Sequence, residues 1–284
     1  MAAEGQAAKR RLPVLAARPG PPPRGRSLLR ALERPLLALD AVIARALPAS
    51  RNPFVQTGAI ANLSFAVALA TGILLLFWYV PSVQQAYPSL EAMRANWAVL
   101  LVRSLHRYSS DVCVLFIVLH ALRYFSSGRF AGPRWLAWVT GIASTGLLWF
   151  EGWLGYWLVW DQRAQQVALG TARMLDRFPF FTDPLTRSFL TDEGINTLLF
   201  FLVFFAHMLL PLLIVIGLWL HITRLSRPLF LPDRLMAAWS VGAMLLVSII
   251  WPATSAAPAK MLVPPLAFTM DYFYLLPIAL TDRL

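Results

Sequence analysis

The chain has 284 residues, of which 58% are hydrophobic, and its 25 Lys and Arg against 14 Asp and Glu give a formal net charge of +11. Ordinary soluble domains are roughly half apolar, so this composition excludes a soluble globular protein and indicates an integral membrane protein. Ten of the 25 basic residues lie between Lys9 and Arg51, ahead of the first long apolar stretch. Membrane topology explains that placement, and we expect no nucleic-acid binding.

The N-terminal region divides into two parts. Residues 1–26 are rich in Pro, Ala and Arg, and no apolar cleavable core follows the early arginines, which predicts a disordered basic tail rather than a signal peptide. Residues 27–50 place leucines and charges on opposite faces at helical spacing. This pattern predicts an amphipathic helix that lies on the membrane surface and contacts lipid.

The rest of the chain predicts an all-α integral membrane fold. A helix needs about 20 apolar residues to cross a bilayer, and five stretches are long enough: 55–80, 101–125, 135–160, 194–224 and 234–252. The first four would form an antiparallel transmembrane bundle within residues 51–225. Residues 226–284 would add a fifth helix and a partial sixth hydrophobic segment at 262–280, whose crossing of the membrane is left open.

Arginines in the predicted loops indicate the topology. With a cytoplasmic N-terminus, Arg129, Arg134, Arg227 and Arg234 all fall in cytoplasmic loops, as the positive-inside rule expects. The loop at 161–193 mixes both signs and would lie outside. Only two of the basic residues are lysines, and Ala and Pro are abundant, which favours a GC-rich bacterial genome. We therefore expect a multi-pass protein of a bacterial plasma (inner) membrane.

All four histidines of the chain lie in predicted spans: His106, His120, His207 and His221. Within each helix the two are 14 residues apart, which is about 21 Å along the axis and within roughly 40° of the same face. A single histidine in an apolar helix is more often a packing residue, but ionisable groups in spans tend to mark functional sites. We expect an outer pair, His106 with His207, and an inner pair, His120 with His221.

Two imidazoles in an apolar slot suit haem iron, since a porphyrin fills the other four coordination positions. Zinc would need four ligands. Cys113 is the single cysteine, which excludes an intrachain disulfide and a CxxC haem attachment. The pattern therefore predicts two haem b cofactors, each with two histidine ligands.

Arginines accompany the histidines at helical spacing. Arg103, Arg123 and Arg224 each lie three residues from a histidine, displaced toward the nearer membrane surface. Haem propionates need cationic partners, and arginine suits carboxylates. Snorkelling of these side chains to lipid headgroups is the alternative.

Glycines repeat the same interval. Two pairs are 14 residues apart, namely Gly58 with Gly72 and Gly141 with Gly155. Glycine lets a bulky flat group approach a helix backbone, which favours haem contact. Small residues also serve plain helix packing in membranes.

These segments resemble cytochrome b of the cytochrome bc and bf quinol-oxidising complexes. The second helix is carried by "RSLHRYSSDVCVLFIVLHALRYF" (103–125), the third by "WVTG" (138–141) and "GYWLVWDQ" (155–162), and the fourth by "FAHMLLP" (205–211). The resemblance implies axial histidines from the second and fourth helices and paired glycines from the first and third. It also implies that Trp138 contacts haem and that Arg103 and Arg123 bind propionates.

The C-terminal segment is similar to the family's quinol-site segment. "VPPLAFTMDYFYLLPIAL" (263–280) matches its TPP…PEWYFLF pattern, which implies Asp271 as a proton acceptor for quinol, with Tyr156 in the same outer site. The alternative for Asp271 is a solvated loop acid. Val159 and Asp161 replace the family's proline and glycine in the wall of this site. Candidates for an inner quinone site are Ser226 and Asp233.

The leading prediction is a dihaem redox subunit of a membrane quinol oxidoreductase that acts only within a complex. Quinone or quinol would be the substrate, with a Rieske iron–sulfur protein and a cytochrome c as partners. The family has eight helices, so a further membrane subunit would supply the others, and a homodimer is also considered. One alternative is a haem b anchor that links quinone to a peripheral dehydrogenase or a multihaem cytochrome. Another is a non-redox polytopic membrane protein.

Overall fold

Helices dominate the computed structural model of the chain, which describes residues 26–48, 51–177, 197–225, 228–260 and 272–281. Within these ranges the β-type pairing is one isolated bridge, between Asp161 and Pro258. The predicted N-terminal tail, Ser226 and Asp271 lie outside the described residues. The predicted all-α fold is confirmed.

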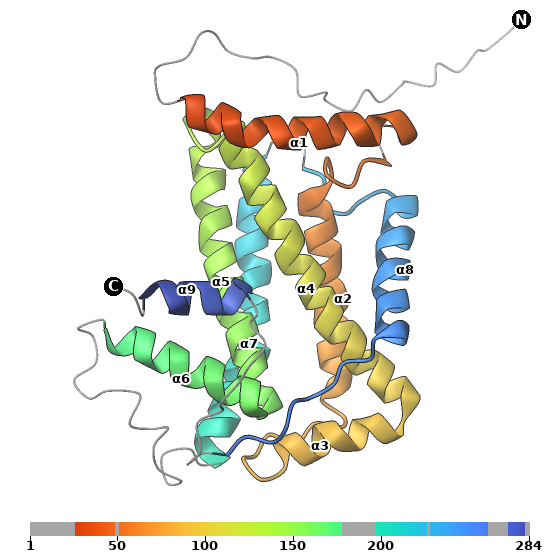
Figure 1. The fold of residues 1–284 in the computed structure, drawn as a ribbon, viewed down its shortest axis with the longest axis vertical. Helices are drawn as coiled ribbons and strands as arrows, with labels where there is room; N and C mark the ends of the chain where they lie inside the picture. Colours follow the sequence, from red (N-terminus) through yellow and green to blue (C-terminus); the bar gives the residue numbers. More distant parts are fainter. Residues whose placement is uncertain (1–25, 49–50, 178–196, 226–227, 261–271, 282–284) are drawn as a thin grey trace, which may run out of the picture.

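Four long helices stand side by side and form the bundle (Figure 1). They are α2 (Thr57–Leu75), α4 (Trp97–Ser126), α5 (Trp135–Val159) and α7 (Thr197–Thr223). The most extensive packing is of α2 along α4 and of α5 along α7. In the described part of the chain α2, α4 and α7 are long and apolar enough to cross a membrane. A shorter apolar helix, α8 (Arg234–Ile250), packs on α4 and α2.

One end of the bundle is covered by α1 (Arg26–Ala46), which lies across the helix ends (Figure 1). Arg123 of α4 forms an ion pair with Asp40 of α1, with 2.6 Å between Nη2 and Oδ2. Asp40 also accepts a hydrogen bond from the side chain of Asn52 at 3.1 Å. These contacts hold α1 where a membrane-surface helix would lie.

The opposite end holds the short helices α3 (Ala86–Ala92) and η2 (Met93–Ala95), together with α6 (Gln162–Asp176). Helix α6 lies within a segment that the sequence pattern treats only as a loop. Trp160 ends α5 in the left-handed conformation with φ 52°. Asp161 then starts α6, because its Oδ1 accepts a hydrogen bond from Ala164 N at 2.9 Å and so caps the new helix.

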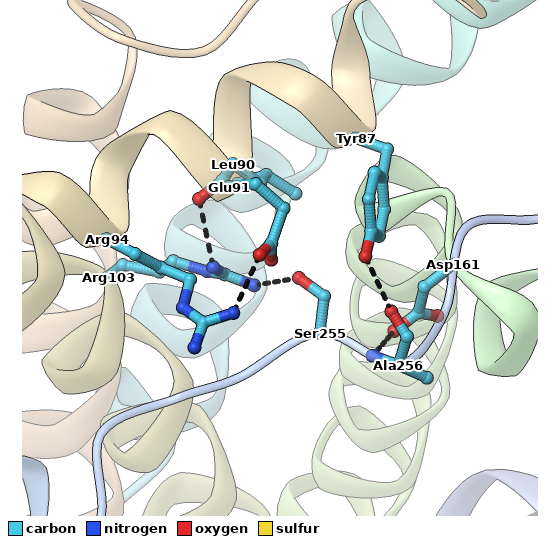
Figure 2. A network of polar contacts seen from close by, with 8 residues as sticks. All are labelled: Tyr87, Leu90, Glu91, Arg94, Arg103, Asp161, Ser255 and Ala256. Atoms are coloured by element: carbon cyan, nitrogen blue, oxygen red, sulfur yellow. Dashed lines mark hydrogen bonds and ion pairs between the residues drawn. The ribbon is translucent and has the colours of Figure 1, made fainter.

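Residues 251–260, here called the strap, run from α8 across this same end (Figure 2). Ser255 Oγ accepts a hydrogen bond from Arg103 Nη2 at 2.7 Å. Ala256 donates its N–H to Asp161 Oδ2 at 2.8 Å, and its carbonyl accepts from Tyr87 at 2.9 Å. Asp161 therefore joins the end of α5, the start of α6 and the strap.

A neighbouring ion pair in Figure 2 ties α3 to η2. Arg94 Nη1 lies 2.8 Å from Glu91 Oε2. Burial alone would raise the pKa of Glu91, but hydrogen bonds with Arg94 and Ser255 and the charges of Arg94 and Arg103 together outweigh it and hold the pKa below its usual range. Glu91 is therefore a carboxylate at neutral pH.

The predicted sixth segment is described only from residue 272 onward. There it forms α9 (Tyr272–Thr281), a helix of 10 residues that contacts α5 and α6 and lies across the bundle in Figure 1. Trp149 of α5 donates a hydrogen bond to the carbonyl of Phe273 at 3.0 Å. Ten residues cover about half of the length that a spanning helix requires.

Candidate haem pockets

The four histidines meet in two pairs between α4 and α7. His106 and His207 lie toward the α3 end, with ring centroids 6.4 Å apart and planes at 87°. His120 and His221 lie toward the α1 end, with centroids also 6.4 Å apart and planes at 76°. We call these the α3-side pocket and the α1-side pocket.

The ring separation fits one metal atom between each pair. A metal–imidazole bond is about 2.0–2.1 Å long, and a ring nitrogen lies about 1.1 Å from the centroid of its ring. Two imidazoles that bind one metal atom from opposite sides therefore have their centroids about 6.3 Å apart. In the described residues no group of three or more His, Cys, Asp or Glu could hold a metal ion. Two ligands per site are too few for zinc but suit haem iron.

Helices α2 and α5 orient three of the rings through Nδ1. A threonine hydroxyl lies near Nδ1 of each ring: Thr71 is 3.4 Å from His106, Thr57 is 3.2 Å from His120 and Thr140 is 3.2 Å from His221. The carbonyl oxygen of Ala68 in α2 lies closer to Nδ1 of His106, at 2.8 Å. The hydroxyls of Thr71 and Thr140 donate to carbonyls of their own helices, so their oxygens are free to accept from Nδ1–H. The Nε2 atoms are then left for a metal.

His207 has a different partner. Its Nδ1 lies 2.8 Å from Glu151 Oε1 and 3.3 Å from the Glu151 carbonyl oxygen. Sequence reasoning missed Glu151. The available signal is that Thr57, Thr71 and Thr140 each precede a pocket glycine directly, whereas Leu154 precedes Gly155.

Each paired glycine faces one imidazole at close range. A Cβ would lie 3.0 Å or less from the histidine Cε1 at all four positions: Gly58 against His120 (2.9 Å), Gly72 against His106 (3.0 Å), Gly141 against His221 (3.0 Å) and Gly155 against His207 (3.0 Å). The glycines therefore make room for the rings themselves, where the sequence suggests room for a flat cofactor.

The α3-side pocket opens into a cavity of about 460 Å³. Arg103 lines it, is buried, and donates hydrogen bonds to the Leu90 carbonyl at 3.1 Å and to Ser255 at 2.7 Å (Figure 2). Tyr156 also lines it, with the Arg107 guanidinium 4.8 Å from its ring centroid. Tyrosine and arginine side chains thus line the cavity that the histidines share.

The α1-side pocket opens into a smaller cavity of about 120 Å³. Trp138 lines it and stacks on Phe125, with 6.0 Å between ring centroids. Arg129 and Arg134 also line this cavity, although sequence reasoning gave them only a topological meaning. They are the basic side chains, apart from the two histidines, among the described residues that line this cavity.

Comparison with known proteins decides the family. A family model described as cytochrome b/b6/petB matches residues 42–229, which is more than half of the chain. The chain belongs to the cytochrome b family.

Individual relatives agree with this membership. Cytochrome b6 of Prochlorococcus marinus strain AS9601 is 37% identical over 124 residues, and cytochrome b6 of Synechococcus sp. strain CC9605 is 36% identical over 124 residues. Each match covers 43% of this chain and 57% of the relative's length. A chain of a solved hyperthermophilic respiratory Complex III shares the fold, with a TM-score of 0.64 at 14% identity over 87% of this chain and 78% of that one.

The predicted resemblance to cytochrome b is thereby confirmed, and with it an integral membrane protein that carries haem b. Other predicted site residues of this cytochrome b lie elsewhere. Arg123 is bound to Asp40, and Arg224 is exposed. Asp233 caps α8 by accepting from Leu235 N at 3.0 Å, and it also accepts from Gln56 at 3.3 Å.

Proposed function

We propose that this cytochrome b is the dihaem electron-transfer subunit of a membrane quinol oxidoreductase. The observation that carries the proposal is the duplicated pocket: two histidines from α4 and α7 stand 6.4 Å apart at each of two levels of the bundle. Along α4 the two levels are 14 residues apart, about 21 Å. Two sites stacked through a bilayer suit transfer across the membrane.

The chain's residues would hold and orient the cofactors. His106 with His207, and His120 with His221, would be the axial ligands through Nε2. Gly58, Gly72, Gly141 and Gly155 leave room for the four rings, and the Nδ1 partners fix their orientation. When bound, each haem would supply the chemistry by taking up and releasing one electron.

Arginines near both pockets would bind the haem carboxylates. Arg103 is buried at the edge of the α3-side cavity, where its charge has no carboxylate bonded to it among the described residues. Arg129 and Arg134 take the corresponding place in the α1-side cavity. Arginine favours carboxylate partners, and Arg129, which is half-buried, and Arg134, which is exposed, are the arginines among the residues that line this cavity. We therefore assign the α1-side role to this arginine pair rather than to Arg123 or Arg224.

The quinol site would lie at the α3-side cavity. Tyr156 lines it and meets Tyr274 of α9 edge-to-face, with ring centroids 4.9 Å apart. Asp271, the proposed proton acceptor, precedes Tyr274 by three residues in the sequence. Its closeness in sequence to a residue that touches Tyr156 supports its place at this site.

The setting of the protein follows as part of the same proposal. Residues 1–26 would be a basic tail, 27–50 a helix on the cytoplasmic surface, 51–225 the dihaem bundle and 226–284 the fifth helix with the quinol-site segment. The membrane would be a bacterial inner membrane. Partners would include a Rieske iron–sulfur protein, a cytochrome c and a further membrane subunit.

Quinol reduction of the purified complex tests this function. The full chain would be isolated from native membranes with its partners and mixed with a reduced quinol while the haem b absorbance is followed. We expect reduction of haem b and co-purification of a Rieske protein. Haem b that stays oxidised under excess quinol contradicts the proposal, and a molybdopterin or multihaem partner would favour the membrane-anchor alternative.

A further inference from the structure

Glu151 places an acidic group against one pocket histidine. It lies in α5 and is only 9% exposed. Its Oε1 is 2.8 Å and its carbonyl oxygen 3.3 Å from Nδ1 of His207, so one residue supplies both acceptors for that nitrogen. The second carboxylate oxygen, Oε2, is buried and has no hydrogen-bond partner within the described ranges.

The other three histidines have neutral partners at the corresponding place. Threonines face the Nδ1 atoms of His106, His120 and His221, and each directly precedes the glycine opposite the ring. The fourth glycine, Gly155, is preceded by Leu154, which is buried in the apolar core and offers no acceptor. Glu151, one helical turn before Gly155, places a carboxyl oxygen beside this ring, as the threonines place hydroxyl oxygens beside the other three.

A charged acceptor changes the ligand more than a hydroxyl does. Hydrogen bonds to ionised groups are roughly twice as strong as neutral ones, and a carboxylate on the outer nitrogen of a ligating histidine raises its basicity. A more basic ligand stabilises ferric iron more than ferrous iron, because the ferric form carries one more positive charge. The effect is large where burial lowers the effective dielectric.

We propose that Glu151 is a positioning residue, which accepts a hydrogen bond from Nδ1 of His207 as an ionised carboxylate and thereby lowers the reduction potential of the haem in the α3-side pocket. This inference rests on the proposed function, since it requires haem on His207. Within the described residues the basic side chain that Glu151 contacts is His207, whose ring is neutral when it ligates iron, so the carboxylate would act mainly through this hydrogen bond.

Redox titration of Glu151→Gln tests the proposal. Glutamine keeps the shape and one acceptor oxygen but removes the charge. Haem b absorbance of the purified protein would be titrated against ambient potential, and the component lost in His106→Ala identifies the α3-side haem. We expect its ferrous-to-ferric ratio to rise about tenfold at a fixed potential, which is about 59 mV for a one-electron couple, while the other haem is unchanged.

Glu91→Gln is the matched control. It removes a carboxylate at the same end of the molecule, where Glu91 pairs with Arg94 and acts by charge on Arg103 instead of contacting a histidine. The α3-side potential should move much less than in Glu151→Gln. Equal shifts in both variants would mean that any nearby charge suffices, and would overturn the specific function of Glu151.

The remaining outcomes separate this inference from the proposed function. Two haems with wild-type potentials in Glu151→Gln overturn the inference alone, whereas a wild-type chain without haem b overturns the proposed function. If Glu151→Gln loses the α3-side haem, Glu151→Gln with Leu154→Thr restores a neutral acceptor like that of the other histidines. That double variant should retain haem at the raised potential, and haem loss there too contradicts a tuning function.

Discussion

Both pockets take one histidine from α4 and one from α7, and in both the rings lie 6.4 Å apart with a glycine opposite each ring. Their surroundings differ. Glu151 and the buried Arg103 line the α3-side pocket, whereas threonines contact both histidines of the α1-side pocket. The repeated residues thus fix ligand geometry, and the residues that are not repeated give each site its own electrostatics.

The ends of the two pockets are also closed differently. The α3-side end is crossed by the strap, which Asp161 and Arg103 bind through side-chain hydrogen bonds. The α1-side end is covered by α1, which Arg123 holds through Asp40. A change at one end should therefore affect one pocket and spare the other.

The largest expected effect comes from removing histidines in pairs. His106→Ala and His207→Ala should each lose the same haem, so the double variant loses no more than either single variant. His106→Ala with His221→Ala should lose both haems, because it damages both pockets. Haem b content of the purified proteins, measured per chain, gives the answer. Equal losses of haem b in the two double variants would contradict the assignment of His106 with His207 to one haem.

Filling the space of a glycine should have a smaller effect on one pocket at a time. In Gly155→Ala the new Cβ meets the His207 ring at 3.0 Å, and in Gly58→Ala it meets the His120 ring at 2.9 Å. Overpacking of this kind costs about 1–3 kcal/mol, so each variant should retain its own haem about 5- to 160-fold less tightly. Haem retention during dilution in detergent is the measurement.

Gly146→Ala is the control for both glycine variants. Gly146 lies in the same helix as Gly155, but a Cβ there meets nothing within 4 Å. It should therefore keep both haems. If Gly146→Ala loses haem as readily as Gly155→Ala, helix propensity or packing rather than ring clearance explains the glycines.

The smallest expected effect comes from loosening the strap. Asp161→Asn keeps a side-chain oxygen that can cap α6, but an amide cannot accept at both oxygen positions, so the bond from Ala256 N is weakened. The loss is about 1 kcal/mol. Hydrogen exchange at residues 251–260 should quicken while exchange near α1 stays the same. Equal quickening at both ends would contradict independent closure of the pockets.

The helices and the pairing of the histidines can be predicted from the sequence because their signals are local and periodic. Apolar stretches predict the helices, and the interval of 14 residues predicts which histidines share a level of the bundle. Asp161 could be read only as a departure from the family. Its capping of α6 is a local contact with Ala164, but its bond to the strap depends on a segment 95 residues later in the chain.

The pocket chemistry was harder to predict because it depends on contacts between helices. Glu151 precedes His207 by 56 residues, and nothing in the local pattern says that its carboxylate reaches Nδ1. Arg123 lies on the face expected for a propionate partner, but it forms an ion pair with Asp40 of α1 instead. Arg129 and Arg134 line the cavity through the fold of the connection before α5.

Haem b content of the wild-type chain tests the central claim most directly. The claim is that each histidine pair binds one haem. The full chain, purified in detergent without loss of cofactor, should contain two haem b per polypeptide by pyridine haemochrome assay, both six-coordinate and low-spin. A chain with one haem b or none, or with haem that survives the loss of all four histidines, would contradict the account.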